Sequence, residues 1–285
     1  MRAPWLFRLG WLVIPFAAGP TIADALHSTA TPGRTIVSIA AWLLWALIMV
    51  ATVVPRTATL TMVRVVAPAT VVAVVWATAE AGFDATAAVG LVVTTVTAAL
   101  SFDPALGESF ANGSAYGDEI RLLLRAPAAV MVGPLPVAWM VTVAGLSAGP
   151  LLLAYQQWLP GAVAVAVGVP LAGLAARSLH TLTRRWLIFV PGGLVVHDPL
   201  ALGEPVLAPG QMIMSVIPAP AEGGERLDLT GGAFGLALQV DLDPPVAFGV
   251  TTRPRRTVVT ETTSVLVTPT RPNRVLELAQ RWRRP

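Results

Sequence analysis

Long apolar runs separated by short polar turns make up the first 176 residues of the chain. A helix that crosses the hydrocarbon core of a membrane needs about 20 mostly apolar residues. The uncharged stretch 126–176 is too long for one crossing, and the sequence Ser-Ala-Gly-Pro at 147–150 divides it. The predicted spans are then residues 9–26, 35–54, 61–78, 85–102, 128–146 and 159–176. The pattern therefore predicts a membrane α-helical bundle of about six transmembrane helices.

Arginines near the ends of these runs occur at every second connection. They are Arg2, Arg8, Arg56, Arg64, Arg121 and Arg125. The intervening connections carry Glu80 and Asp84 or no charge at all, and Arg34 is the one exception. Cytoplasmic connections of membrane proteins are enriched in Lys and Arg. The alternation therefore predicts a multi-pass plasma-membrane protein with its N- and C-termini in the cytoplasm.

The composition excludes several kinds of chemistry. The chain has no cysteine, which excludes disulfides, thiol nucleophiles, iron–sulfur clusters and thiolate zinc sites. Its basic side chains are arginine without any lysine, and the excess of Ala, Val, Pro and Gly is typical of a GC-rich bacterial genome. The net charge is only +3, so nucleic-acid binding is not indicated. Arginines that face anionic lipid account for the charge.

Three features of the spans leave alternatives open. The first span, with an apolar core followed by Ala23-Asp24-Ala25 near its end, resembles a cleavable signal peptide, although we favour a retained span. Prolines inside the spans could build a transporter-like substrate site, or could be tolerated where neighbouring helices satisfy the freed carbonyl groups, which we favour. Small residues four apart in span 159–176 allow close helix packing, either within the chain or between two copies, and we favour the former.

The connection 103–125 is the longest on the predicted cytoplasmic side and is rich in carboxylates. Its candidate functional residues are Asp103, Glu108, Tyr116, Asp118, Glu119 and Arg121. Converging carboxylates can hold Mg²⁺ against a phosphate, which would make this the loop of a membrane enzyme. Their spacing does not match an aspartate-rich phosphotransferase motif, so we favour a structured loop that docks on the C-terminal domain. Residues 118–125 could begin a short interfacial helix.

From residue 177 the pattern changes to short alternating runs with frequent Gly, Pro and charged residues. This predicts a division into a helical domain, 1–176, and a cytoplasmic, mainly-β domain, 177–285. The run 185–190, then Pro-Gly-Gly, then 194–198 is a hairpin pattern. Further strands are predicted at 211–217, 226–229, 236–242, 246–251, 258–262 and 264–267. A final helix begins near Pro272 and has Val275, Ala279 and Trp282 in one apolar stripe.

The hairpin that directly follows the last span, and the strand–Pro–Asn–helix ending Val267-Thr-Pro-Thr-Arg-Pro-Asn-Arg-Val-Leu276, resemble the bacterial PH-domain membrane proteins. The resemblance is confined to residues 177–285 and implies a PH-like barrel closed by the C-terminal helix. PH domains that bind inositol phosphates carry several basic residues around the first hairpin loop. The loop here is Pro191-Gly192-Gly193, so specific phosphoinositide binding is not implied.

Arginines elsewhere in this domain are candidates for binding lipid or a partner. They are Arg184, Arg185, Arg253, Arg255, Arg256, Arg281, Arg283 and Arg284. An exposed arginine near anionic lipid contributes about 1 kcal/mol of attraction, and the alternative is a solvated face. His180 and His197 lack partners at metal-ligand spacing. No catalytic, metal-binding or cofactor-binding residue is predicted, and no cofactor.

Together these features predict a non-enzymatic scaffold or accessory subunit in cell-envelope or lipid-linked processes. The expected partners are membrane lipids and either another membrane protein or a second copy of the chain, but no nucleic acid. One alternative is a small transporter or lipid-handling protein with a cavity among proline-kinked helices. The other is a membrane enzyme that uses the acidic loop 103–119.

Overall fold

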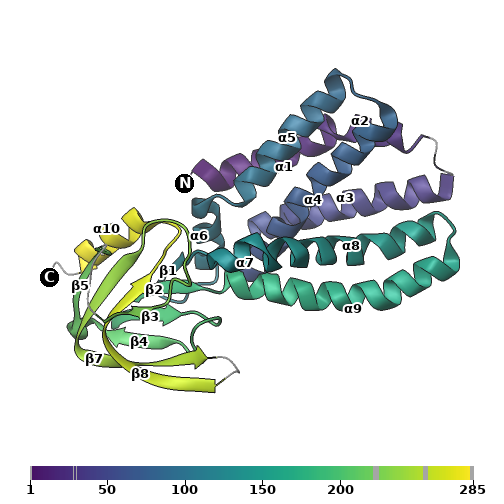
Figure 1. Ribbon diagram of the computed structural model, residues 1–285. Helices are drawn as coiled ribbons and strands as arrows, with labels where there is room; N and C mark the ends of the chain where they lie inside the picture. Colours follow the sequence, from purple (N-terminus) through teal and green to yellow (C-terminus); the bar gives the residue numbers. More distant parts are fainter. Residues whose placement is uncertain (1, 28, 30, 221–224, 253–255, 283–285) are drawn as a thin grey trace. The chain divides into compact units, whose positions relative to one another are not determined.

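The computed structural model describes all residues except 1, 28, 30, 221–224, 253–255 and 283–285, and the chain forms two compact units (Figure 1). The helical unit consists of Met1–Phe110 and Val137–Leu179, and the β unit consists of Ala111–Pro136 and His180–Pro285. The predicted boundary at residue 176 lies close to the last of these junctions. The predicted division also assigns segment 111–136 to the helical domain, whereas in the structure this segment belongs to the β unit.

Eight helices run wholly or mostly within the described part of the helical unit. They are α1 (Arg2–Ala17), α2 (Gly19–Ala25), α3 (Thr31–Val53), α4 (Thr57–Ala81), α5 (Ala85–Ser101), α6 (Pro104–Asn112), α8 (Pro134–Ala154) and α9 (Trp158–Thr183). Among the described residues, five segments are long and apolar enough to cross a membrane, or six if α5 and α6, which meet at a bend of 56°, count as one. The prediction of about six long apolar helices is confirmed at this level.

One predicted span begins later than expected. The sequence pattern begins it at residue 128, but the short helix α7 (Ala128–Val132) ends at Gly133 and α8 begins at Pro134. Proline fits the first position of a helix because the amide hydrogen it lacks would have no partner there. Segment 128–132 therefore forms a separate turn of helix that belongs to the β unit.

Neighbouring helices of the helical unit are joined by side chains that bond to backbone carbonyl groups. Trp11 of α1 and Trp45 of α3 exchange indole hydrogen bonds, each donating to the carbonyl oxygen of the other, at 3.0 and 2.9 Å. Arg8 of α1 donates to the Thr52 carbonyl in the last turn of α3. Arg64 of α4 donates in the same way to Ser101 at the end of α5, at 3.3 Å. A cation at these sites also interacts favourably with the negative end of the helix dipole.

Helices α8 and α9 pack side by side through small residues (Figure 1). A methyl group at Gly145 would collide with the Gly168 carbonyl oxygen, and one at Gly149 would lie 2.5 Å from the Val165 side chain. The small residues of the last span thus allow close packing within the chain, as we favoured.

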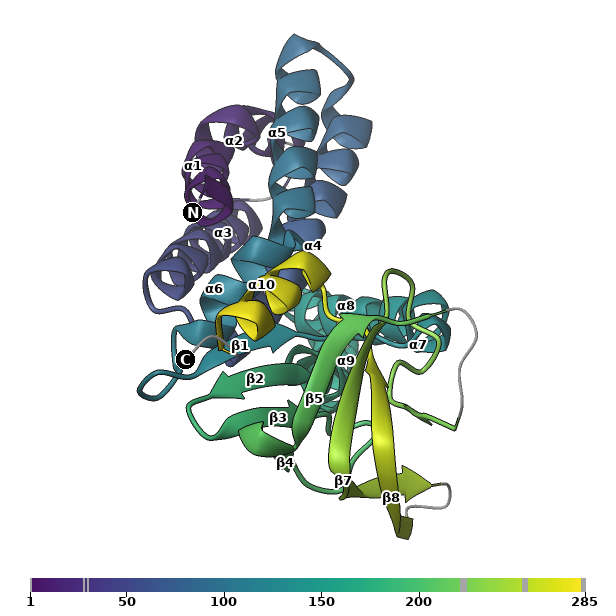
Figure 2. The same cartoon turned by 90° about the vertical axis from the view of Figure 1, so that its left-hand side faces the viewer.

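The β unit contains two four-stranded sheets in its described residues. The first has the order β1 (Ile120–Leu123), β2 (Trp186–Val190), β3 (Gly193–His197) and β4 (Val206–Pro209). The second has the order β5 (Ile213–Pro218), β7 (Leu238–Thr252), β8 (Arg256–Val267) and β6 (Leu227–Asp228). The strands of the first sheet run across those of the second (Figure 2). A 3₁₀ turn, Gly210–Met212, links the sheets, and α10 (Pro272–Trp282) follows the last strand.

The predicted hairpin and C-terminal helix are both present, with three differences elsewhere. Strands β1 and β4 were not predicted, and residues 120–123 form a strand in place of the expected interfacial helix. The four predicted strands between residues 236 and 267 are two long strands, because β7 continues through Pro244 and Pro245 at an irregularity in its pairing with β8.

The core of the β unit lies between the two sheets and α10. Leu122 and Leu124 are buried in it together with side chains from both sheets. Val275, Leu278 and Ala279 of α10 cover one side of the same core. The predicted apolar stripe of this helix is therefore present at Val275 and Ala279, and the side chain of Trp282 lies outside those described. Helix α10 packs on the sheets rather than lying free, because its apolar face has a core to cover.

Candidate functional site

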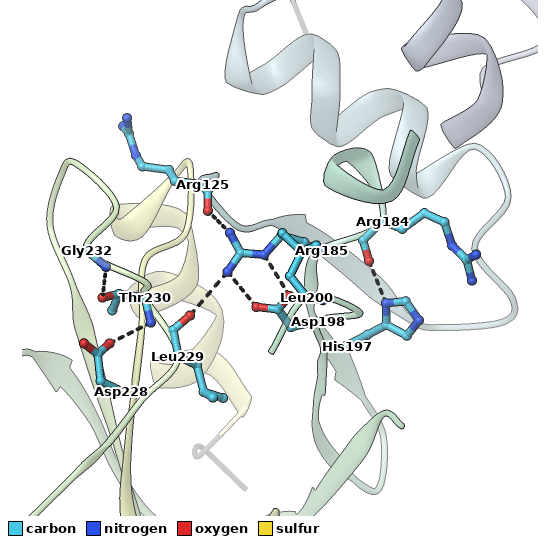
Figure 3. Close-up of polar contacts among 10 residues, drawn as sticks. All are labelled: Arg125, Arg184, Arg185, His197, Asp198, Leu200, Asp228, Leu229, Thr230 and Gly232. Carbon is cyan, nitrogen blue, oxygen red and sulfur yellow. Dashed lines mark hydrogen bonds and ion pairs between the residues drawn. The ribbon is translucent and has the colours of Figure 1, made fainter. Parts of the chain in front are cut away.

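A buried ion pair joins the two ends of the β2–β3 hairpin (Figure 3). Arg185 Nε donates to one carboxylate oxygen of Asp198 at 2.8 Å, and its Nη2 donates to the other at 2.6 Å. The exposed fraction is 2% for Arg185 and 1% for Asp198. In the hairpin register Trp186 lies opposite His197, so the next two residues outward also lie opposite each other and share a face of the sheet.

The same guanidinium group holds two loops of the β unit (Figure 3). Its Nη1 donates to the carbonyl of Arg125, and its Nη2 donates to the carbonyl of Leu229 at 3.3 Å. Asp198 also accepts the Leu200 amide at 3.0 Å. All three guanidinium nitrogen atoms of Arg185 and both carboxylate oxygens of Asp198 thus make hydrogen bonds within the protein. This pattern is typical of a structural charge pair, in which burial requires every polar atom to be satisfied.

The turn that presents the Leu229 carbonyl is ordered by its own side chains (Figure 3). The Asp228 carboxylate accepts the Thr230 amide at 2.7 Å, and the Thr230 hydroxyl accepts the Gly232 amide at 3.1 Å. Gly231 and Gly232 have φ angles of +59° and +69°, which glycine adopts without steric cost. The turn therefore holds a fixed carbonyl group toward Arg185.

The segment that contains β1 is bound to the rest of the β unit by backbone hydrogen bonds. The Leu124 amide donates to the Arg185 carbonyl at 2.9 Å, and the Arg125 amide donates to the Thr268 carbonyl at 2.8 Å. In return, the Thr270 amide donates to the Leu123 carbonyl at 2.8 Å. The structure agrees with the docking hypothesis for residues 111–125.

The carboxylates of the candidate functional loop are not brought together in one compact unit. Asp103 accepts the Ala105 amide at 2.7 Å and so caps α6, and it belongs to the helical unit with Glu108. Glu119 accepts the Tyr116 amide at 2.6 Å and pairs with Arg121. The described residues contain no group of three or more His, Asp or Glu side chains that could hold a metal ion.

Tyr116 and Asp118 are exposed at the tip of this loop, with 91% of Tyr116 accessible. Arg121 lies inside the loop: its guanidinium carbon is 4.8 Å from the centre of the Trp186 ring. The Asn112 side chain bonds both the amide and the carbonyl of Arg121, each at 2.8 Å. The loop is therefore a closed structural element with an exposed tip.

The basic candidates fall into three groups. Arg184, Arg256 and Arg281 are exposed. Arg185 is buried, which corrects the expectation that it belongs to a surface patch, because its charge is neutralised by Asp198 inside the unit. The remaining four, Arg253, Arg255, Arg283 and Arg284, lie outside the described residues.

His197 of the β unit takes a structural role. His197 Nδ1 donates to the Arg184 carbonyl at 2.6 Å, and its ring stacks on Trp186 with a centre-to-centre distance of 5.1 Å. This bond fixes which ring nitrogen carries the proton. His197 and Asp198 are neighbours in sequence, but Asp198 is turned toward Arg185, so the two do not form a catalytic pair.

A polar network on the second sheet was not predicted. Asp241 of β7 accepts hydrogen bonds from Ser215 of β5, Gln239 of β7 and Ser264 of β8. Burial raises the pKa of the Asp241 carboxyl, but these hydrogen bonds and the charge of Arg226 outweigh it and hold the pKa below its ordinary value of 3.8. The alternation of Gln239 and Asp241 with buried Val240 was the available signal, although it cannot name the partners on other strands.

Comparison of the chain with protein-family models, with curated proteins and with solved structures gives no match.

Proposed function

We propose that this chain is a multi-pass plasma-membrane protein whose β unit is a PH-like module on the cytoplasmic side, and that it acts as a non-catalytic scaffold or accessory subunit. The observation that carries the proposal is the origin of β1. An outer strand of the first sheet, with two leucines of the core, comes from a connection between apolar helices. The chain thus passes between the helical unit and the β unit at three points rather than one, which supports the proposal of a module held at the membrane.

Membrane insertion is supported by the outer surface of the helical unit. Large apolar side chains are widely exposed there, among them Phe16 (76%), Leu43 (65%) and Val53 (68%). A soluble monomer rarely leaves so much contiguous apolar surface in water. In a bilayer the same side chains would contact lipid.

The proposed orientation is supported by two arginine contacts. Arg8, near the start of α1, reaches the end of α3, and Arg64, near the start of α4, reaches the end of α5. In each pair the contact joins an arginine near the start of one helix to the end of a helix that leads into an arginine-bearing connection, as the alternation of arginines requires. At the other end of α3, Gly33 lies against the Ala154 carbonyl at the end of α8. The connection 155–157 that follows α8 carries no arginine, and Arg34 beside Gly33 is the exception to the alternation.

A PH-like fold for the β unit is supported by its two crossed sheets and by the single C-terminal helix on their shared core. The unit departs from the simple pattern in taking β1 from an earlier segment of the chain. The first hairpin loop, Pro191-Gly192, remains without a basic residue, so the proposed partner is a protein rather than an inositol phosphate.

Single cysteines can test the topology cleanly, because the chain contains none. Exposed Glu80 and Gln157 should react, as Glu80→Cys and Gln157→Cys, with a membrane-impermeant maleimide added to intact cells. Tyr116→Cys and Glu277→Cys should react only after the membrane is opened. Labelling of Glu277→Cys in intact cells would place the β unit outside and refute the proposal.

The scaffold role can be tested by photocrosslinking in native membranes. A photoreactive amino acid at exposed Tyr116, Arg184 or Leu207 of the β unit should yield one discrete protein adduct. The same adduct should form in the Asp118→Asn, Glu119→Gln variant, because a scaffold does not need the carboxylates of the acidic loop. Val53, on the apolar outer face of the helical unit, is the control position and should not yield this adduct. Enzymatic turnover that is lost in the Asp118→Asn, Glu119→Gln variant would favour the enzyme alternative.

A further inference from the structure

The helical unit contains an apolar cavity that the proposed scaffold role does not use. Its volume is about 550 Å³, within the range of small-molecule sites. One wall is formed by α1 and α2, which meet at Ala18, and the other walls are formed by α3 and α4. Gly19 and Pro20, the first two residues of α2, lie in the first of these walls.

The cavity can recognise hydrocarbon and little else. None of its lining side chains is charged, and only Ser38 and Thr70 carry hydroxyl groups. Thr70 donates to the Ala67 carbonyl of its own helix at 2.7 Å. The indole groups of Trp11 and Trp45 are occupied by their mutual backbone bonds. A polar ligand would lose its hydration here without gaining partners, whereas an alkyl chain loses nothing.

A positive charge lies one helical turn beyond the lining residues. Ser38 and Trp45 of α3 line the cavity, and Arg34 precedes Ser38 by four residues, which places it on the same face of the helix. Arg34 is half-exposed and lies in the first turns of α3, at the opposite end from the Thr52 carbonyl that Arg8 binds. It is also the one arginine that departs from the alternation between connections.

We propose that this cavity holds one acyl chain of a bilayer phospholipid whose phosphate group lies at Arg34. The hydrocarbon walls select the chain, and the guanidinium group supplies paired donors for phosphate oxygens. The apolar outer face of the surrounding helices makes membrane lipid the available source. This inference rests on the proposed membrane insertion but not on the role of the β unit.

The test is a lipid titration of the purified full-length protein, delipidated in detergent and followed by native mass spectrometry. Phosphatidylglycerol should bind with one molecule retained per chain. Diacylglycerol, which has the chains without the phosphate, should bind about tenfold more weakly, since a charge-assisted hydrogen bond is lost. Arg34→Gln should reduce phosphatidylglycerol binding to the diacylglycerol level, whereas Arg56→Gln, at the start of α4, should change neither.

The chain site is tested by filling the cavity. Ala41→Leu lines the cavity and should weaken both lipids at least tenfold, while Ala40→Leu, an exposed neighbour outside the lining, should have no effect. Ala69→Leu on the α4 wall repeats the test if Ala41→Leu does not fold.

Four results would overturn the proposal. They are unchanged phosphatidylglycerol binding in Ala41→Leu or Ala69→Leu, unchanged phosphatidylglycerol binding in Arg34→Gln, an equal loss of both lipids in Arg34→Gln, and tighter binding of a free fatty acid than of phosphatidylglycerol. These results are independent of the cysteine labelling, so failure here is distinguishable from a wrong topology.

Discussion

Replacing Arg185 by methionine should open the β unit locally, because it leaves the Asp198 carboxylate buried without its partner. Removing one member of a buried ion pair typically costs 3–5 kcal/mol. Arg185 and Asp198 are 2% and 1% exposed, so water cannot replace the lost guanidinium without opening the structure. The variant also frees the carbonyl groups of Arg125 and Leu229. The opening equilibrium should therefore rise by roughly 10²- to 10⁴-fold.

Hydrogen exchange of the full-length protein, read by mass spectrometry, measures this opening directly. The reporting amides are those of Leu124, Arg125 and Thr270, which join β1 to the rest of the unit at 2.8–2.9 Å. Their exchange should accelerate by the same factor in Arg185→Met, whereas amides of α8 and α9 should keep their protection. Local acceleration of this kind is expected when the global fold persists.

Two further variants separate charge from packing. Arg184→Met changes the exposed neighbour and should leave the same amides protected. Asp198→Asn combined with Arg185→Met removes the orphaned charge while keeping an acceptor for Leu200, and should recover part of the protection. Equal protection in Arg185→Met and Arg184→Met would refute the assignment of a stabilising role to the buried pair.

Three other outcomes are expected. Residues 180–285 expressed alone should lack cooperative thermal unfolding, because they lose the buried Leu122 and Leu124, each worth roughly 1.5–3 kcal/mol. A chain that joins residues 111–127 to 180–285 through a Gly/Ser linker should regain it, and cooperative unfolding of the shorter piece would show that β1 is dispensable. Asp241→Asn should reduce the stability of the β unit most near neutral pH. Since the pKa of Asp241 is lowered, its contribution is lost as the pH falls below about 4, so the difference from wild type in urea midpoints should shrink there; a constant difference would contradict the network. Gly145→Ala should lower the melting temperature of the protein in detergent by crowding Gly168, at a cost of about 1–3 kcal/mol, and Gly173→Ala, which has open space around it, is the control that should melt like wild type.

The sequence predicts what depends on local pattern. The β2–β3 hairpin follows from alternation around Pro191-Gly192-Gly193, and its register would also have placed Arg185 opposite Asp198. Helix α10 follows from Pro272 and its apolar stripe. Strand β1 could not be predicted in this way, because Ile120–Leu123 reads equally well as helix and its partner β2 lies more than 60 residues later. Strand propensity depends on such neighbours.

The cavity illustrates a second limit. Its walls come from three stretches of chain, and only the prolines at positions 15 and 20 hinted at a gap there. Arg34 was recognisable as an exception to the charge pattern, but its relation to Ser38 and Trp45 has meaning only once those side chains are known to line a cavity.

The origin of β1 has a consequence for how the protein is made. Residues 120–123 leave the ribosome before α8 and α9, yet their partner strand β2 is synthesised only after both helices. Leu122 and Leu124 therefore remain without their partner strand until α8 and α9 have been synthesised. If α8 and α9 span the membrane as proposed, completion of the β unit requires that this pair of helices returns the chain to the side on which β1 lies. A chain in which that step fails would present unpaired strands and bare leucines, which are features that quality-control proteases and chaperones recognise in unfolded chains.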